Sequence, residues 1–519
     1  MPTDNAPLVY LETFGCQMNV LDSELVTGHL LAMGYRFTND RDGADVVLFN
    51  TCSVREQAEN KVFSRVGRLK QEKQAGRKVT IGLLGCLAER EGASLLTRQP
   101  EIDLLCGPGE LDRLPMLLDN AMKEELVDWR QRSALQGSRS RRSATLSAAE
   151  DSLESLDLAR AFDPDFRESG FPSAYVRITR GCNKFCTYCV VPHTRGAEVH
   201  RTPDAVVNEC KALADRGVIE ITLLGQTVNH YMYVHGAAVG ADGRERPQIG
   251  PGLTAFGKPD RGAAGRRVTT FADLLGRIHE EVPAILRLRF VTSYPRDFGD
   301  DILEVMRASP RICRYLHVPA QSGSDRILKL MNRGYTVGQY RDFIDRVHTF
   351  LPDASIAGDI IVGFPTETDD DFERTCTLVR DLPFKNNFVF KYSPRPGTVA
   401  IDRYPDDVDE SVKRRRINRL LEIQSEVSRR VHQREVGRTH SVFVEKIGQK
   451  STSGGGRVEL GWTSGSVQLS GRTMGDLITV FDVPGEDAAR RLLGSIVPVE
   501  VKKAAPRLLW GRWTGAGDG

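Results

Sequence analysis

Short apolar runs alternate with helical patterns along most of this chain, and this alternation is the feature that most restricts its fold. Near the N-terminus, four runs are separated by three helical stretches: 8–15, 45–51, 79–85 and 102–107, with helices near 20–33, 55–73 and 87–97. Consecutive strand–helix units place their strands in parallel, with helices on the faces of the sheet. We therefore predict an N-terminal α/β domain built on a parallel sheet.

The alternation resumes near Pro172 with six further apolar runs: 174–179, 219–225, 285–291, 315–320, 356–363 and 387–393. Six strand–helix units are too few for the closed eightfold barrel, so we predict a partial (β/α)6 barrel. A long helix at 409–437 follows. Short strands separated by turn residues then predict a small all-β barrel.

A chain of 519 residues is too long for a single core, and changes in composition indicate its divisions. A Ser/Arg-rich stretch, 130–152, favours a solvated linker over an RNA contact, and a Gly/Pro-rich insertion, 235–267, predicts a poorly ordered surface loop. The expected divisions are an N-terminal domain at 7–125, a flexible linker at 126–168, the partial barrel at 169–405, a connecting helix at 406–436 and the small barrel at 437–504.

The composition indicates a protein of the cytoplasm. The net charge of +2 is close to balance, so any surface for nucleic acid must be local. The N-terminal residues lack the pattern of a signal peptide, and no apolar run approaches the ~20 residues of a membrane span. In that compartment the ten cysteines stay reduced, which favours metal ligands or core residues over disulfides.

Three cysteines lie close together in "RGCNKFCTYCVVP", after the first predicted strand of the barrel: Cys182, Cys186 and Cys189. Their loop is expected at the C-terminal mouth, where barrel active sites form. Three thiolates can hold three irons of a [4Fe–4S] cluster, leaving the fourth iron open to chelate a small molecule. The alternative is a zinc site with a remote fourth ligand, His193 or His200, although zinc sites usually contain paired CxxC motifs.

This trio, with Tyr188 directly before its last cysteine, resembles the signature of radical S-adenosylmethionine enzymes. The resemblance implies that the open iron binds the methionine group and that Tyr188 lies near the adenine. By the same resemblance, Gly225 and Gln226 in "LLGQT" contact the methionine amino group. Gln321 and Ser322 in "VPAQSGS", and Gly363 in "GDIIVGFPTE", lie beside the ribose and adenine. Tight strand-to-helix turns are the alternative role for the glycines.

A second trio is spread along the N-terminal domain. Cys16, Cys52 and Cys86 each follow directly on a predicted strand. Ligands in open parallel sheets gather at the carboxyl ends of strands, so these three thiols are expected to converge. The alternative is three independent buried thiols. Cys106 also follows a strand, but "LLCGPGE" favours a core position, as do the helical or strand patterns around the remaining cysteines: Cys210, Cys313 and Cys376.

With "GCQMNVLDSE" (15–24), the stretches 50–70, 84–90 and "SPRPGTVA" (393–400), the chain resembles the methylthiotransferases of the radical S-adenosylmethionine group. This resemblance implies a second [4Fe–4S] cluster on Cys16, Cys52 and Cys86 that takes part in sulfur delivery, and a C-terminal TRAM domain. It implies methylthiolation of C2 of N6-isopentenyladenosine at tRNA position 37, since "TCSVREQAENK" and "CTYCVVPHTRG" are similar to that branch. Threonylcarbamoyl-adenosine or a ribosomal-protein aspartate are the alternative substrates.

The resemblance also implies partners: the tRNA anticodon loop, a sulfur source and an electron donor such as flavodoxin or ferredoxin. We expect a monomer. Basic residues of the small barrel are candidate phosphate contacts, with Trp462 and Phe443 as candidate stacking residues. The basic set is Lys446, Lys450, Arg457, Arg472, Lys502 and Lys503. Core aromatics and ordinary surface charge are the alternative, and a zinc-bearing RNA-binding protein is the alternative to an enzyme.

Overall fold

The computed structural model describes residues 6–53, 56–123, 131–136, 154–157, 160, 172–250, 266–448 and 466–515. Its N-terminal domain contains a six-stranded parallel sheet in the order β2-β1-β3-β4-β5-β6. The strands are β1 (Leu8–Phe14), β2 (Arg36–Phe37), β3 (Val46–Thr51), β4 (Thr80–Leu84), β5 (Leu104–Cys106) and β6 (Ser133–Ala134). The predicted α/β architecture is confirmed, and the two-residue strands β2 and β6 are additions at its edges.

Helices cover both faces of this sheet, as strand–helix alternation requires. One face packs against α1 (Gln17–Ala32) and α5 (Leu114–Met122). The other packs against α2 (Glu56–Gln74), α3 (Cys86–Glu91) and α4 (Ser94–Arg98). The apolar residues around α1 include Tyr175 and Leu224 of the partial barrel, so α1 is enclosed between the two domains.

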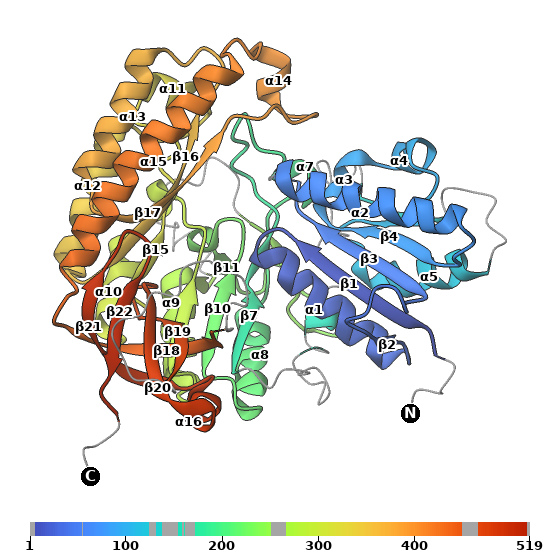
Figure 1. The fold of residues 1–519 in the computed structure, drawn as a ribbon, viewed down its shortest axis with the longest axis horizontal. Helices are drawn as coiled ribbons and strands as arrows, with labels where there is room; N and C mark the ends of the chain where they lie inside the picture. The colour runs from blue at the N-terminus through green and yellow to red at the C-terminus, as the bar shows by residue number, and fades with distance from the viewer. Residues whose placement is uncertain are drawn as a thin grey trace.

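The central domain is the predicted partial barrel. Its six parallel strands are β7 (Ser173–Arg177), β10 (Glu220–Leu224), β14 (Arg287–Phe290), β15 (Tyr315–His317), β16 (Ser355–Val362) and β17 (Phe384–Lys391). They form two three-stranded sheets joined by a bridge between Leu288 and Ile312. The outer face is covered by α8 (Pro203–Asp215), α9 (Phe271–Glu281), α10 (Asp300–Ala308), α12 (Val337–Phe350), α13 (Asp369–Asp381) and α15 (Glu410–Gln433). Helices α12, α13 and α15 lie together outside β16 and β17 (Figure 1).

The chain ends in a closed five-stranded barrel in the order β18-β19-β20-β22-β21. Its strands are β18 (Thr439–Ile447), β19 (Ser466–Arg472), β20 (Ile478–Pro484), β21 (Ile496–Ala504) and β22 (Leu509–Trp513), with α16 (Gly485–Leu492) after β20. Strand β22 lies beyond the predicted boundary at 504, because pairing with both β20 and β21 is what closes the barrel. The stretch "RVELGWTS" (457–464) also has the pattern of a short strand, and it lies outside the described residues.

Two predicted loops contribute to sheets. Within the expected linker, β6 pairs with β5, and Leu105 N donates to Arg132 O at 2.9 Å, because β5 otherwise presents an unpaired edge. Within the insertion, β12 (Gln248–Ile249) pairs with β9 (Val199–His200), so residues up to Gly250 are anchored rather than loose. Strands β11 (Met232–Val234) and β13 (Val268–Thr270) pair at its base.

The turn between β19 and β20 caps the amino-terminal ends of the partial-barrel strands. Arg289 donates through Nε to Glu220 at 2.8 Å and through Nη2 to Thr473 O at 2.8 Å. Lys385 Nζ lies 2.6 Å from Asp476 Oδ2, and all four side chains are largely removed from solvent. The small barrel therefore lies at the end of the partial barrel opposite to the loops that follow the strands (Figure 1).

We predict that Asp476→Ala destabilises this junction by about 3 kcal/mol, because removing one partner leaves buried cations uncompensated. Burial alone would raise the pKa of Asp476, but Lys385, Arg289 and Arg472 lower it from 3.8 to about 2. The contribution is therefore complete above about pH 4 and is lost as the pH falls toward 2. Denaturant unfolding at pH 7 and pH 3 measures both effects. Asp487→Ala, on the exposed surface of α16, is the control, and an equal loss in both variants would contradict the prediction.

Candidate functional site

The N-terminal trio lies at one edge of the sheet. Cys16 follows β1 at the start of α1, Cys52 follows β3, and Cys86 begins α3 directly after β4. These strands are neighbours, so their carboxyl ends meet. The Cys52 side chain hydrogen-bonds Cys16 and lowers the pKa of that thiol to about 6, with Arg195 adding to the effect. Burial raises the pKa of Cys86, against the influence of Arg195.

Two buried asparagines hold this edge together. Asn19 Nδ2 donates to Asn50 Oδ1 at 3.1 Å, and Asn50 Nδ2 donates to Asn19 O at 2.8 Å. A Cβ on Gly15 would lie 2.7 Å from Cys52 Cβ, and at φ +153° this residue lies where glycine is favoured. The first turn of α1 is therefore fixed against the end of β3. Both asparagines lie in the stretches that resemble the family, 15–24 and 50–70, but no sequence pattern indicated their role.

The central trio lies in the loop after β8 (Thr179–Arg180). Cys189 N donates to Cys186 O at 3.0 Å, Lys184 N donates to Cys182 Sγ at 3.5 Å, and Arg333 Nη1 donates to Cys186 Sγ at 3.4 Å. Burial raises the pKa of Cys182, and it raises that of Cys189 to about 12. Thiolates in such surroundings require positive charge from bound metal, which an iron–sulfur cluster or a zinc ion would supply.

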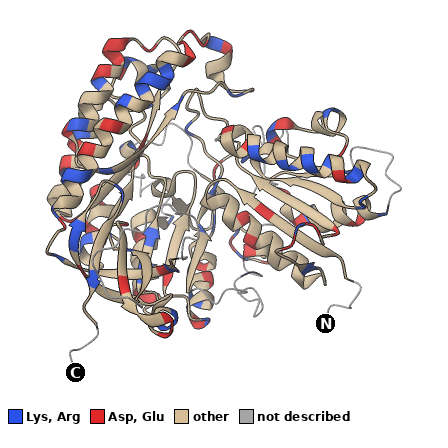
Figure 2. Ribbon diagram, viewed as in Figure 1, with Lys and Arg blue, Asp and Glu red and all other residues tan. Residues whose placement is uncertain are grey.

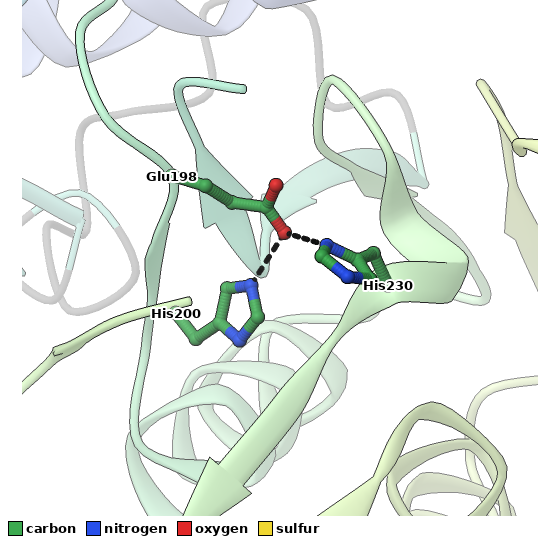
Figure 3. A group of neighbouring side chains, drawn as sticks. All are labelled: Glu198, His200 and His230. Carbon is green, nitrogen blue, oxygen red and sulfur yellow. Dashed lines mark hydrogen bonds and ion pairs between the residues drawn. The ribbon is translucent and has the colours of Figure 1, made fainter. Parts of the chain in front are cut away.

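A buried carboxylate anchors this loop (Figure 3). Glu198 Oε1 lies 2.8 Å from His200 Nε2 and 2.7 Å from His230 Nδ1. Asn183, next to Cys182, donates its N–H to Glu198 Oε2 at 3.4 Å and accepts from Glu198 N through Oδ1 at 3.1 Å. Burial alone would raise the pKa of Glu198, but the two histidines lower it to about 2.

These three side chains are also close enough to hold a metal ion, since their ligand atoms lie within 4.8 Å of one another. Their hydrogen bonds also test whether His200 could be the fourth ligand of a zinc site formed with the central trio. His200 is occupied by Glu198 and by Met232 O, which lies 2.9 Å from its Nδ1, so it does not serve as the fourth ligand of the trio. His193 lies in α7 (Val191–Thr194), beside Gly397.

Polar side chains without hydrogen-bond partners gather where the strands of the partial barrel end. Among the described residues, four such buried atoms follow β7, β10, β14 and β15: Thr179 Oγ1, Gln226 Oε1, Ser293 Oγ and Gln321 Oε1. Gln321 also adopts a positive φ of 68°. Buried polar atoms normally have partners, so this ring fits a polar ligand bound at the mouth of the barrel. Two of the four, Gln226 and Gln321, are predicted cofactor contacts.

The other predicted cofactor contacts differ. Tyr188 packs against an apolar group that includes Met331 and Phe364. A Cβ on Gly225 would lie 2.1 Å from Thr179 Oγ1, so this glycine permits a close approach within the ring. The Ser322 hydroxyl instead accepts from Ser324 N at 3.2 Å and faces Thr375 of α13, because it alternates with Gln321.

Gly363 has φ +69°, and a Cβ there would lie 2.4 Å from Lys413 Cγ of α15. Its N–H donates to Glu367 Oε2 at 2.6 Å. This glycine therefore makes room for α15 and holds a tight turn after β16, which is the alternative that the sequence left open.

The elements that carry the two trios meet across the interface between the domains. Helix α7 follows Cys189 and contacts α3, whose first residue is Cys86. The Thr194 side chain hydrogen-bonds Cys86. The next residue, Arg195, is buried, and its Nη2 lies 2.6 Å from Asp22 Oδ2 of α1. The arginine thus brings positive charge from the central domain to the N-terminal trio, and no sequence pattern distinguished it from other arginines.

The remaining cysteines have separate surroundings. Cys106 is buried, and its Sγ donates to Glu110 O at 3.2 Å. The other three are buried: Cys210, Cys313 and Cys376.

The predicted RNA contacts of the small barrel are partly wrong. Phe443 is fully buried and unable to stack on a base. Arg472 is paired with Glu445 and Asp476, and Lys502 with Glu500. Lys446 is exposed, and Lys503 Nζ lies 5.4 Å from the Trp510 ring centroid. The other three candidates lie outside the described residues: Lys450, Arg457 and Trp462.

Figure 2 shows basic and acidic residues interleaved along α12, α13 and α15. Several of these charges are paired with each other, as in Arg419 with Glu373 at 2.6 Å. No helix in the described part of the chain is long and apolar enough to cross a membrane.

Two family models match the chain: "Uncharacterized protein family UPF0004" over residues 8–107 and "Radical SAM superfamily" over residues 176–379. The tRNA-2-methylthio-N(6)-dimethylallyladenosine synthase of Rhodopirellula baltica is 39% identical over 504 residues, covering 97% of this chain and 95% of that protein. The synthase of the same name from Paraburkholderia xenovorans is 38% identical over 506 residues, covering 97% and 96%. A solved structure of the radical S-adenosylmethionine methyltransferase TsrM from Kitasatospora setae is similar at 14% identity and TM-score 0.48, covering 76% of this chain and 77% of that one.

We predict that anaerobic reconstitution loads about eight irons per chain and that Cys→Ala changes in either trio remove about half of them. Cys106→Ala is the matched control, because this thiol is buried and lies at the end of β5 in the same sheet. Iron analysis and electron paramagnetic resonance of the reduced protein measure the result. Stoichiometric zinc, or unchanged iron in both trio variants, would contradict it.

Proposed function

The chain belongs to the radical S-adenosylmethionine methylthiotransferases, and we propose how its residues carry out that reaction on tRNA. The reaction is methylthiolation of C2 of N6-isopentenyladenosine at position 37. The single observation that supports this assignment best is similarity over nearly the full chain to synthases of this modification. The named relatives therefore favour this substrate over threonylcarbamoyl-adenosine and over a ribosomal-protein aspartate.

The two trios are the proposed ligands of two [4Fe–4S] clusters. Cys182, Cys186 and Cys189 would hold the cluster whose open iron binds S-adenosylmethionine. Cys16, Cys52 and Cys86 would hold the second. When bound, these groups supply the radical chemistry that removes an unactivated hydrogen and the site of sulfur delivery; no acid or base side chain removes such a hydrogen at neutral pH.

The protein side chains hold the bound groups in place and neutralise their charge. Arg333, stacked on Tyr294 with its guanidinium carbon 4.4 Å from the ring centroid, donates to Cys186 and is held rigidly. Gln226 and Gln321 offer unpartnered carbonyl oxygens toward the S-adenosylmethionine that the mouth of the barrel would receive. Arg195 and Asp22 join the domains beside the N-terminal trio, so that one substrate atom can meet both sites in turn.

Beyond the tRNA, the proposed partners are an electron donor such as flavodoxin or ferredoxin and a sulfur source, either the second cluster itself or exogenous sulfide. We propose a monomer that acts in the cytoplasm, where tRNA is modified. The target base must leave the stack to reach a site at the mouth of a barrel, and an unpaired anticodon-loop base costs less to extrude than a paired one.

We predict that tRNA nucleosides from a strain without this protein lack the 2-methylthio group and accumulate N6-isopentenyladenosine. Mass spectrometry of digested tRNA measures both nucleosides. Complementation with the wild-type chain restores the product, whereas Cys86→Ala and Cys186→Ala do not. Unchanged tRNA together with an unmodified ribosomal protein would contradict the substrate assignment.

A further inference from the structure

One large apolar side chain is left exposed on the inner face of the partial barrel. Phe388 is 46% exposed although it lies within β17, a strand whose other residues are mostly buried or half-buried. Its neighbour Asn387 faces the opposite way, because Asn387 Nδ2 donates to Gln424 Oε1 of the outer helix α15 at 2.7 Å. Strand side chains alternate, so the Phe388 ring faces inward.

A polar pair lies beside this ring. Leu316 on β15 and Val318 directly after this strand pack into the outer core, which turns the intervening His317 inward. On β16, Ile360 packs outward and Asp359 inward by the same alternation, and Asp359 is the direct register partner of Phe388. The rings of His317 and Phe388 have centroids 6.3 Å apart in an edge-to-face arrangement.

The two side chains of this pair, His317 and Asp359, interact only weakly with each other. His317 Nε2 lies 3.4 Å from Asp359 Oδ2 and has no hydrogen-bond partner among the described residues. The Asp359 side chain remains 24% exposed and that of His317 14%. The inner face therefore presents the hydrogen-bonding groups of His317 and Asp359 next to the exposed phenyl ring of Phe388.

Its position connects this group to the mouth of the barrel. Gln321 N donates to Asp359 O at 2.8 Å. Asp359 is therefore in direct backbone contact with Gln321, a proposed S-adenosylmethionine contact. The next inward residue on β16, Ile361, packs against the apolar group that also receives Tyr188. Below, Asp476 of the capping turn is paired with Lys385, and Glu220 of β10 is paired with Arg289. The surface between is therefore suited to a ligand without net charge.

Resting on the proposed function, we propose that Phe388, His317 and Asp359 receive the N6 edge of the target adenine. The His317–Asp359 pair binds the N6–H and the ring nitrogens around it, while the Phe388 ring contacts the isopentenyl chain that begins at the same N6 atom. The group thus sets the preference for a prenylated base, and the reacting centre lies above it.

The test measures binding rather than turnover. Fluorescence anisotropy with the anaerobically reconstituted full chain compares two anticodon stem-loops, one with N6-isopentenyladenosine at position 37 and one with adenosine. The wild type is expected to prefer the prenylated loop. In Phe388→Ala this preference falls about tenfold, the scale expected for losing contact with one or two methyl groups, while affinity for the unprenylated loop is unchanged.

Asp359→Ala is the second variant, and it is expected to weaken both loops by a similar factor, because both carry the N6–H. Leu421→Ala, an exposed apolar truncation on the outer helix α15, is the control and changes neither affinity. Unchanged affinity for the unprenylated loop shows that Phe388→Ala remains folded.

The proposal is overturned if Phe388→Ala keeps the wild-type preference, or if it weakens both loops equally. A wild type that shows no preference for the prenylated loop overturns the proposal as well. The substrate assignment fails separately, if the tRNA nucleosides of the deletion strain are unchanged.

Discussion

The structure depends on the contact between α7 and α3, reinforced by the buried ion pair of Arg195 and Asp22. Each trio is built by its own domain, because parallel strands end at one edge and their loops converge there. Convergence within a domain does not bring two sites together. The short helix that follows Cys189 does so, since its Thr194 hydrogen-bonds Cys86 and its next residue is the arginine that neutralises charge beside the N-terminal trio.

The candidate reaction site and the stabilising contacts of the small barrel lie at opposite ends of the partial barrel. The mouth of the partial barrel holds the central trio and the ring of unpartnered polar atoms, while the small barrel closes the opposite end through Asp476, Lys385 and Arg289. Between these ends lies an inner face on which Phe388 is uncovered. A base bound at this face would have the polar atoms of the barrel mouth on one side and the paired charges of the small-barrel junction on the other.

Much of this was visible in the sequence, for physical reasons. Buried parallel strands such as β3 are continuous apolar runs, so the architecture could be predicted. Cysteines directly after neighbouring parallel strands must lie at one edge, so the position of the N-terminal trio could be predicted as well. Strands of two residues, such as β6, are too short to show a hydrophobic periodicity, so they could not be predicted. Phe443 alternates with Val442 and Val444 of the small-barrel core, so its burial depends on contacts that no local pattern encodes. Arg195 and Phe388 are likewise defined only by neighbours distant in sequence.

The most direct test of the central claim, that the two trios form one site, is magnetic. In the anaerobically reconstituted chain with both clusters reduced, electron paramagnetic resonance should show spin–spin interaction between them, as broadened signals with faster relaxation than in either single-trio variant. Arg195→Gln, which removes the buried ion pair, should weaken that interaction. Two independent signals in the wild type, each identical to the signal of a single-trio variant, would contradict the account.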